Sequence, residues 1–169
     1  MTKLSATYKG LITGGILVLI SIFMFYGLKL APNGPTQMVI IGIFIAGVLW
    51  SLISLRQTSD ELTFKNYFSE GFKTFIVMTL IIVIYTAVFY KLNPAILEAV
   101  IKENEALVAK QGDKTPAEIA ANSDKLRSIF MPMTISLTTV TYLAFGAITS
   151  VIGGLFLKSA GSGPKVRPA

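Results

Sequence analysis

The chain has 169 residues, of which 53% are hydrophobic and 14% are charged, and its mean hydropathy is positive. Soluble domains carry about 25% charged residues, so this composition indicates one small integral membrane domain. With no cysteine, no histidine and a net charge of +6 that forms no basic patch, the sequence predicts no disulfide, no catalytic, metal or cofactor site and no nucleic-acid partner.

Four stretches are long and apolar enough to cross a bilayer, because roughly 20 residues at 1.5 Å each span a hydrocarbon core of about 30 Å. None of them contains Asp, Glu, Lys or Arg. The expected spans are residues 10–28, 38–55, 74–90 and 134–157. They predict an all-α integral membrane four-helix bundle, with a single domain over residues 1–158 and a flexible basic tail over 159–169.

Small residues one helical turn apart occur in the first two spans. Gly10 and Gly14 form such a pair in the first span, and Gly42 and Ala46 form one in the second. Between them the segment Lys29–Gln37 contains two prolines and a glycine. We therefore expect a tight turn that makes the first two spans an antiparallel hairpin.

Aromatic residues recur at steps of three and four just before the third span, which is typical of one face of a helix. We expect an amphipathic helix over residues 63–73 that lies in the headgroup layer and sets the depth and angle of the third span. The alternative is a docking helix whose polar side faces a cytoplasmic partner. The aromatic side carries Phe64, Tyr67, Phe68 and Phe72, and the polar side carries Lys65, Glu70 and Lys73.

The loop between the third and fourth spans, residues 93–131, contains helix start and stop signals. Asn93 and Pro94 suit the start of a helix and Gly112 its end, while Thr115 and Glu118 have the spacing of a capping box. The sequence therefore predicts two short outer helices. Their apolar sides pack on each other or on the membrane, or they bind a partner outside the cytoplasm.

The last span carries a third ridge of small residues, because Gly146, Ser150 and Gly154 are spaced by four. Lipid supplies no hydrophobic drive for helix association, so close backbone approach at such ridges must contribute it. The ridges predict packing within one bundle, or an interface to a second copy or a larger complex. Three ridges are more than the interior of one four-helix bundle is expected to use.

The basic residues of the two tails predict the orientation. Lys3, Lys9, Lys158, Lys165 and Arg167 lie close to spans without acidic neighbours, whereas the basic residues of the outer loop are balanced by acids. The positive-inside rule therefore places both termini in the cytoplasm.

The stretch "LTFKNYFSEGFKTFIVMTLIIVIYTAVFYKLNPAILEAVI" precedes a polar helical loop and a last span rich in Gly, Ser and Thr. From Lys9 to Lys158 the chain resembles the small bacterial inner-membrane proteins with four predicted spans that are catalogued only as a domain of unknown function. Its most specific part is "TFKNYFSEGFK". The resemblance implies a fold and a bacterial inner-membrane location, and it implies no reaction.

The expected role is non-catalytic. Asp60 and Glu61 are adjacent and point about 100° apart on a helix, which suits helix capping better than acid–base catalysis. We expect a small accessory or scaffold subunit that binds another membrane protein. The alternative is a passive or lipid-directed transporter or channel-like protein acting as a homo-oligomer, which would need a polar cavity reaching the midplane.

Overall fold

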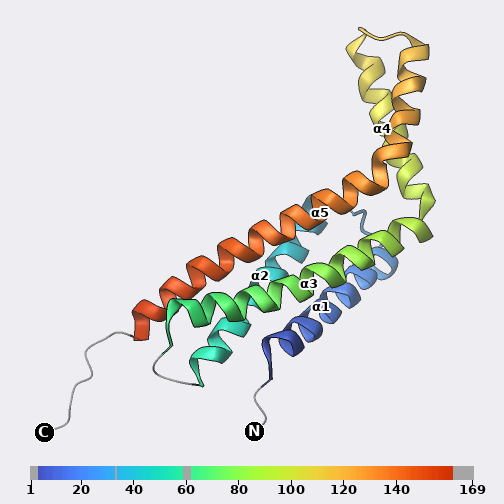
Figure 1. The fold of residues 1–169 in the computed structure, drawn as a ribbon. Coiled ribbons are helices and arrows are strands. Elements are labelled where there is room, and N and C mark those ends of the chain that lie inside the picture. The colour runs from blue at the N-terminus through green and yellow to red at the C-terminus, as the bar shows by residue number, and fades with distance from the viewer. Residues whose placement is uncertain (1–3, 33, 59–61, 162–169) are drawn as a thin grey trace, which may run out of the picture. The chain divides into compact units, whose positions relative to one another are not determined.

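The computed structural model describes residues 4–32, 34–58 and 62–161 (Figure 1). Its elements are α1 (Ala6–Ile22), which continues into the π-helical turn η1 (Phe23–Gly27), then α2 (Gly34–Arg56), α3 (Phe64–Leu92), α4 (Pro94–Gln111) and α5 (Pro116–Gly161). Four helices, namely α1 with η1, α2, α3 and α5, are long and apolar enough to cross a membrane. The predicted all-α, four-span membrane fold is confirmed.

The chain divides into two compact units, which are described separately. The first joins the residues up to Ile82 with those from Val140 onward, and the second runs from Val83 to Thr139. In the first unit α1, α2, the beginning of α3 and the end of α5 run alongside one another (Figure 1). These segments form the helical bundle.

The core of the first unit is apolar and is built from all four segments. Its fully buried side chains include Leu17, Phe44, Val48 and Met78. Tyr142 of α5 packs edge-on against Phe44, with 4.9 Å between the ring centroids, and its hydroxyl accepts a 3.0 Å hydrogen bond from the side chain of Gln37. The one polar group of this aromatic pair therefore has a partner, which lowers the cost of burying it.

The turn that connects the first two spans is shorter than the sequence predicts. The spacing places a turn over Lys29–Gln37, but α2 begins at Gly34, inside that turn. Pro35 follows at once, and proline suits a first helical turn because the N–H that it lacks has no partner within the helix. Lys29 has a φ of 57°, so the chain reverses through a left-handed residue soon after η1.

The expected amphipathic helix over residues 63–73 forms the first part of α3 and leads into the third span. The helix continues through Gly71 into the third span and has 29 residues. The Asn66 side chain accepts a 2.9 Å hydrogen bond from the Thr63 N–H at its start. Asp60 and Glu61, which the sequence assigns to capping, lie outside the described residues.

The second unit contains a hairpin of α4 and the beginning of α5. Gly112 ends α4 in the left-handed conformation, with a φ of 73°. The capping box is present, because the Glu118 N–H donates to Thr115 Oγ1 at 3.3 Å and the Thr115 N–H donates to Glu118 Oε2 at 2.7 Å. Local sequence signals therefore predict the helix boundaries of this hairpin well.

Contacts within the second unit hold this hairpin in place. Ile101 of α4 is buried, and Phe130 of α5 packs edge-on against Tyr90 near the end of α3, with 5.2 Å between the ring centroids. Arg127 donates to Glu98 at 3.0 Å across the two helices. This hydrogen bond holds the pKa of the Glu98 carboxyl below its ordinary value.

The second predicted outer helix is not separate from the fourth span. The sequence predicts that the second outer helix ends near residue 131 and that the span begins at residue 134, but α5 continues through Pro132 as one helix of 46 residues. A proline removes one backbone hydrogen bond, and the bonds of the turns on either side persist. Such prolines are tolerated in membrane helices, which explains why the expected break is absent.

Candidate functional site

A buried ion pair joins α1 to α3 in the first unit. Lys9 Nζ lies 2.8 Å from Glu70 Oε1, and the two side chains are only 7% and 16% exposed. Moving charges out of water is costly, so ionisable residues in membrane helices are rare and usually paired. A pair this deep in the bundle therefore needs other polar groups around it.

Hydroxyl groups from α2 and α3 complete the surroundings of the ion pair. Ser51 Oγ donates to Glu70 Oε1 at 3.2 Å and lies 2.8 Å from Thr74 Oγ1, and the Ser51 carbonyl accepts from Lys9 Nζ at 3.4 Å. Thr74 Oγ1 also lies 2.9 Å from the carbonyl oxygen of Glu70. We call Lys9, Ser51, Glu70 and Thr74 the polar cluster. It links three helices, and its hydrogen bonds offset part of the desolvation cost of the charges.

The sequence predicts solvent-exposed positions for the two charged residues of the polar cluster, and the structure largely buries both. Lys9 is assigned to an uncompensated tail and Glu70 to a polar helix side beside Lys65 and Lys73. However, α1 begins at Ala6, so Lys9 lies in the same buried stripe as Gly10 and Thr13. The sequence analysis did not predict this pair. A signal for it was present, because Lys9 and Glu70 have opposite charges and each lies within one helical turn of the start of an expected span.

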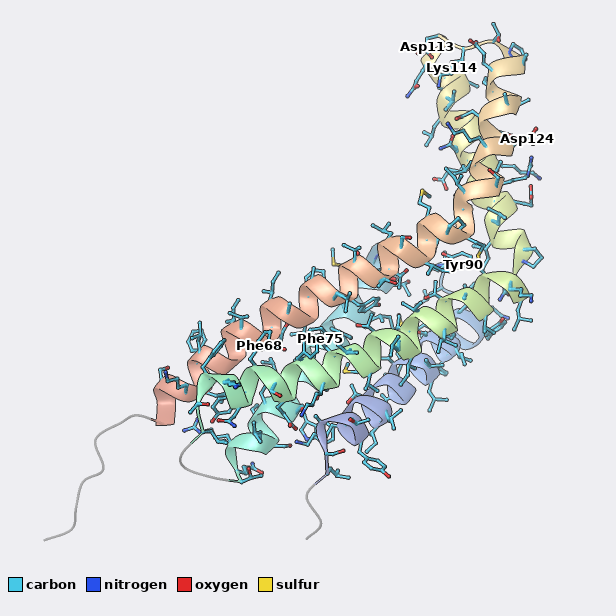
Figure 2. All side chains as sticks on the ribbon, in the orientation of Figure 1. Phe68, Phe75, Tyr90, Asp113, Lys114 and Asp124 are labelled. Atoms are coloured by element: carbon cyan, nitrogen blue, oxygen red, sulfur yellow. The ribbon has the colours of Figure 1, made fainter. Side chains whose placement is uncertain are left out.

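The other residues of the expected docking helix have mixed environments. Lys65, Phe72 and Lys73 are exposed, whereas Tyr67 is buried. The rings of Phe64, Phe68 and Phe72 follow one another along α3 with centroids about 6 Å apart. Figure 2 shows Phe68 and Phe75 along the same helix. Docking of a partner on this segment stays a prediction.

The ridge of the first span and the ridge of the last span both lie against α3. A methyl group added at Gly10 would lie 2.8 Å from the Thr74 carbonyl oxygen, and one at Gly14 would meet Ile81. On the other side Gly146 lies against the ring of Phe75, and Gly154 lies against Tyr67. The Ser150 hydroxyl occupies the space beside Gly71, where α5 and α3 are close. These two ridges are therefore used inside the first unit.

The ridge of α2 has a different environment. Gly42 and Ala46 are both exposed, and a methyl group added at Gly42 would meet nothing within 4 Å. Gly47, which is close to Gly42 in sequence, is buried against Thr13. The side of α2 that packs in the bundle therefore contains Gly47, whereas the ridge of Gly42 and Ala46 that the sequence predicts for packing faces outward.

A groove of about 380 Å³ lies between α2 and α5, next to the open ridge. Thr149, which is only 8% exposed, is the one residue with a hydroxyl group among those that line it. The groove is lined by Ile45, Leu49, Ile53, Ile148, Thr149, Ile152, Gly153, Phe156 and Leu157. We call the exposed ridge of α2 together with this groove the lateral face.

The arrangement offers packing surfaces and one closed ion pair. In the parts of the chain that the structure describes, no three His, Cys, Asp or Glu residues gather as a metal site would require. The carboxylate of Glu70 accepts from both Lys9 and Ser51. Chemically, the polar cluster therefore holds helices in a fixed relative position.

Comparison with known proteins identifies a family and no activity. The model of the family described as "Protein of unknown function (DUF4199)" matches residues 8–159. No curated protein and no solved structure matches the chain.

Proposed function

Since the chain belongs to the DUF4199 family, whose function is unknown, we propose a role from the geometry: the protein is a non-catalytic accessory or scaffold subunit that binds another membrane-protein chain through its lateral face. The observation that carries the proposal is the open ridge. Gly10, Gly14, Gly146 and Gly154 are used within the first unit, whereas Gly42 has nothing within 4 Å. Small residues that face lipid allow another helix to approach closely.

The hairpin of the second unit offers a surface for a partner outside the bilayer. Val100 and Leu107 of α4 and Ile129 of α5 are exposed, whereas Ile101 of α4 and Phe130 of α5 are buried. A partner that docks on the hairpin would cover these apolar residues. We assign the lateral face to association within the membrane and this hairpin to an extramembrane partner.

The protein is proposed to lie in the bacterial inner membrane with both termini in the cytoplasm. Arg56 ends α2, Lys65 and Lys73 lie near the start of α3, and Lys158 lies near the end of α5. These basic residues gather at one end of the first unit, and the positive-inside rule assigns that end to the cytoplasm. Lys3, Lys165 and Arg167, on which the sequence argument also relied, lie outside the described residues.

The transport alternative has less support. Of the residues that line the lateral groove, only Thr149 offers a side-chain polar group, so the groove gives an ion or a polar solute little to replace its hydration. Lys9 and Glu70, whose side chains are largely buried in the first unit, are paired with each other. Both observations favour association over transport.

The experiment compares two glycines that are both open to substitution. Gly42 on α2 and Gly15 on α1 have nothing within 4 Å, so Gly42→Leu and Gly15→Leu are both expected to fold. Affinity purification in lipid nanodiscs, followed by native mass spectrometry of the intact complexes, measures the chains that remain bound, further copies of this chain included. We expect Gly42→Leu to lose an associated chain that both the wild type and Gly15→Leu retain. If no associated chain depends on Gly42, the proposed function is wrong.

A further inference from the structure

Thr149 has an unsatisfied hydroxyl group in the lateral groove. Its side chain is 8% exposed and makes no hydrogen bond to any residue that the structure describes. Lipid tails offer no hydrogen-bonding group, so a hydroxyl at this depth remains unsatisfied when lipid covers it. A polar group from another protein chain would satisfy it.

Trp50 presents a matching donor on the same face. It is 40% exposed on α2, one helical turn after Ala46, and its indole N–H has no partner among the described residues. Tryptophan N–H groups usually find a hydrogen-bond partner when they leave water. The lateral face therefore carries one unsatisfied donor and one unsatisfied acceptor.

The donor and the acceptor lie at similar depth. Gly153 of α5 lies against Leu49 and Leu52 of α2, and both helices run toward the same end of the first unit. Thr149 is one turn before Gly153, so it is level with the turn that contains Ala46. Side chains on a helix lean toward its N-terminus, so the ring of Trp50 also covers the level of Ala46.

We propose that the lateral face binds a second copy of this chain, with the indole of Trp50 from each copy entering the groove of the other and donating a hydrogen bond to Thr149. Two copies of one membrane protein share an orientation, so a two-fold axis along the membrane normal keeps every residue at its own depth. The indole of Trp50 and the hydroxyl of Thr149 lie at similar depth, so they can meet across such an axis. Gly42 and Ala46 allow the two α2 backbones to approach, and each hydrogen bond occurs twice.

This inference rests on the proposed function, because it takes the lateral face to be a docking surface and names its occupant. A second copy at this face leaves the hairpin of the second unit for an extramembrane partner. The chain is then a homodimeric scaffold.

Cysteine cross-linking between copies tests the proposal, because the chain has no cysteine of its own. Two copies with different tags, one with Trp50→Cys and one with Thr149→Cys, are co-expressed and oxidised in native membranes. We expect a disulfide-linked pair that carries both tags. The control replaces Trp50→Cys by Ile12→Cys, because Ile12 is also exposed and its neighbour Thr13 lies against Gly47, at nearly the same depth. The control pair should not cross-link.

A second measurement tests the hydrogen bond without adding cysteines at the interface. Trp50→Phe and Thr149→Val each remove one partner and keep most of the side-chain volume. Energy transfer between labelled copies in liposomes should show that either change raises the dissociation constant of the dimer roughly ninefold, since two interhelical hydrogen bonds of about threefold each are lost. The double variant should lose no more than either single variant.

The outcomes separate this inference from the proposed function. Equal cross-linking of the Ile12 control, or dimerisation unchanged in Trp50→Phe and Thr149→Val, would overturn the Trp50–Thr149 contact. If copies do not cross-link but a different chain still depends on Gly42, the second copy is wrong and the proposed function stands. If neither a copy nor another chain depends on Gly42, lipid covers the lateral face and both proposals fail.

Discussion

Lys9 and Glu70 each lie near the start of a membrane-spanning helix and each carry a charge that the bilayer disfavours. Neither is neutralised by water, because both side chains are largely buried. They are tolerated because they neutralise each other at 2.8 Å and because Ser51 adds hydrogen bonds from a third helix. The interaction depends on both partners, so it has a measurable coupling.

A double-mutant cycle measures this coupling. Lys9→Met or Glu70→Gln alone leaves one charge buried without its partner, and each should lower the free energy of unfolding by about 3 kcal/mol. The double variant should recover most of that loss, because no uncompensated charge remains. Unfolding in mixed micelles, followed by circular dichroism, provides the values. Additive losses would show that the two charges act independently.

At the scale of elements, α3 is the helix against which the two neighbouring ridges pack. Gly10 and Gly14 bring α1 close to it, and Gly146 and Gly154 do the same for α5. A glycine at such a contact has no side chain to displace its neighbour, which is why these positions differ from the glycines that face outward. Replacing glycine by alanine should therefore lower stability at a packed position and leave it unchanged or slightly higher at an outward-facing one.

Gly146→Ala and Gly42→Ala form the matched pair. A methyl group at Gly146 would overlap Phe75, so this change should destabilise the bundle by about 1–3 kcal/mol. At Gly42 the methyl group meets nothing, and the higher helix propensity of alanine should leave stability unchanged or raise it slightly. The thermal unfolding midpoints of the two variants in detergent, each compared with the wild type, measure these effects. Equal midpoints for the two variants would show that the α5 ridge is not tightly packed.

The hairpin of the second unit should depend on pH through Glu98. The hydrogen bond from Arg127 holds the pKa of Glu98 below its ordinary value of 4.5, so the ionised form favours the folded hairpin. This contribution is fully present above pH 4.5 and is lost as the pH falls through the lowered pKa of the folded state. The unfolding midpoint of the wild type should exceed that of Glu98→Gln at neutral pH. The difference should vanish in acid; a constant difference would contradict the assignment.

At the scale of the whole molecule, an even number of spans places both ends of the chain on one side of the membrane. The four helices long enough to cross a bilayer meet this condition. Asp113 and Lys114 lie at the tip of the hairpin between α4 and α5 (Figure 2), whereas Thr58 follows α2. The proposed orientation, with both termini in the cytoplasm, predicts that the tip lies outside and that Thr58 lies inside.

Labelling of single cysteines tests this topology, because no native cysteine competes. A membrane-impermeant maleimide should label Asp113→Cys when the outer face of the inner membrane is accessible. Thr58→Cys should react only after the membrane is opened. The reverse pattern would place both termini outside the cytoplasm.

Local patterns in the sequence determined much of this protein. Runs of apolar residues of the right length determined the four spans, because lipid leaves a backbone segment few alternatives to a helix. Pro94, Gly112 and the Thr115–Glu118 capping box determined both ends of α4 and the start of α5, because these signals act within one turn.

Only the tertiary structure decided which of these residues meet. Gly42 and Gly146 occur in similar patterns, yet one is open and the other lies against Phe75, because the rotation of each helix in the bundle selects the face that is buried. Lys9 and Glu70 are 61 positions apart, and no local pattern pairs them. Their contact requires α1 and α3 to lie side by side, and α2 to supply Ser51, so it depends on packing and not on propensity.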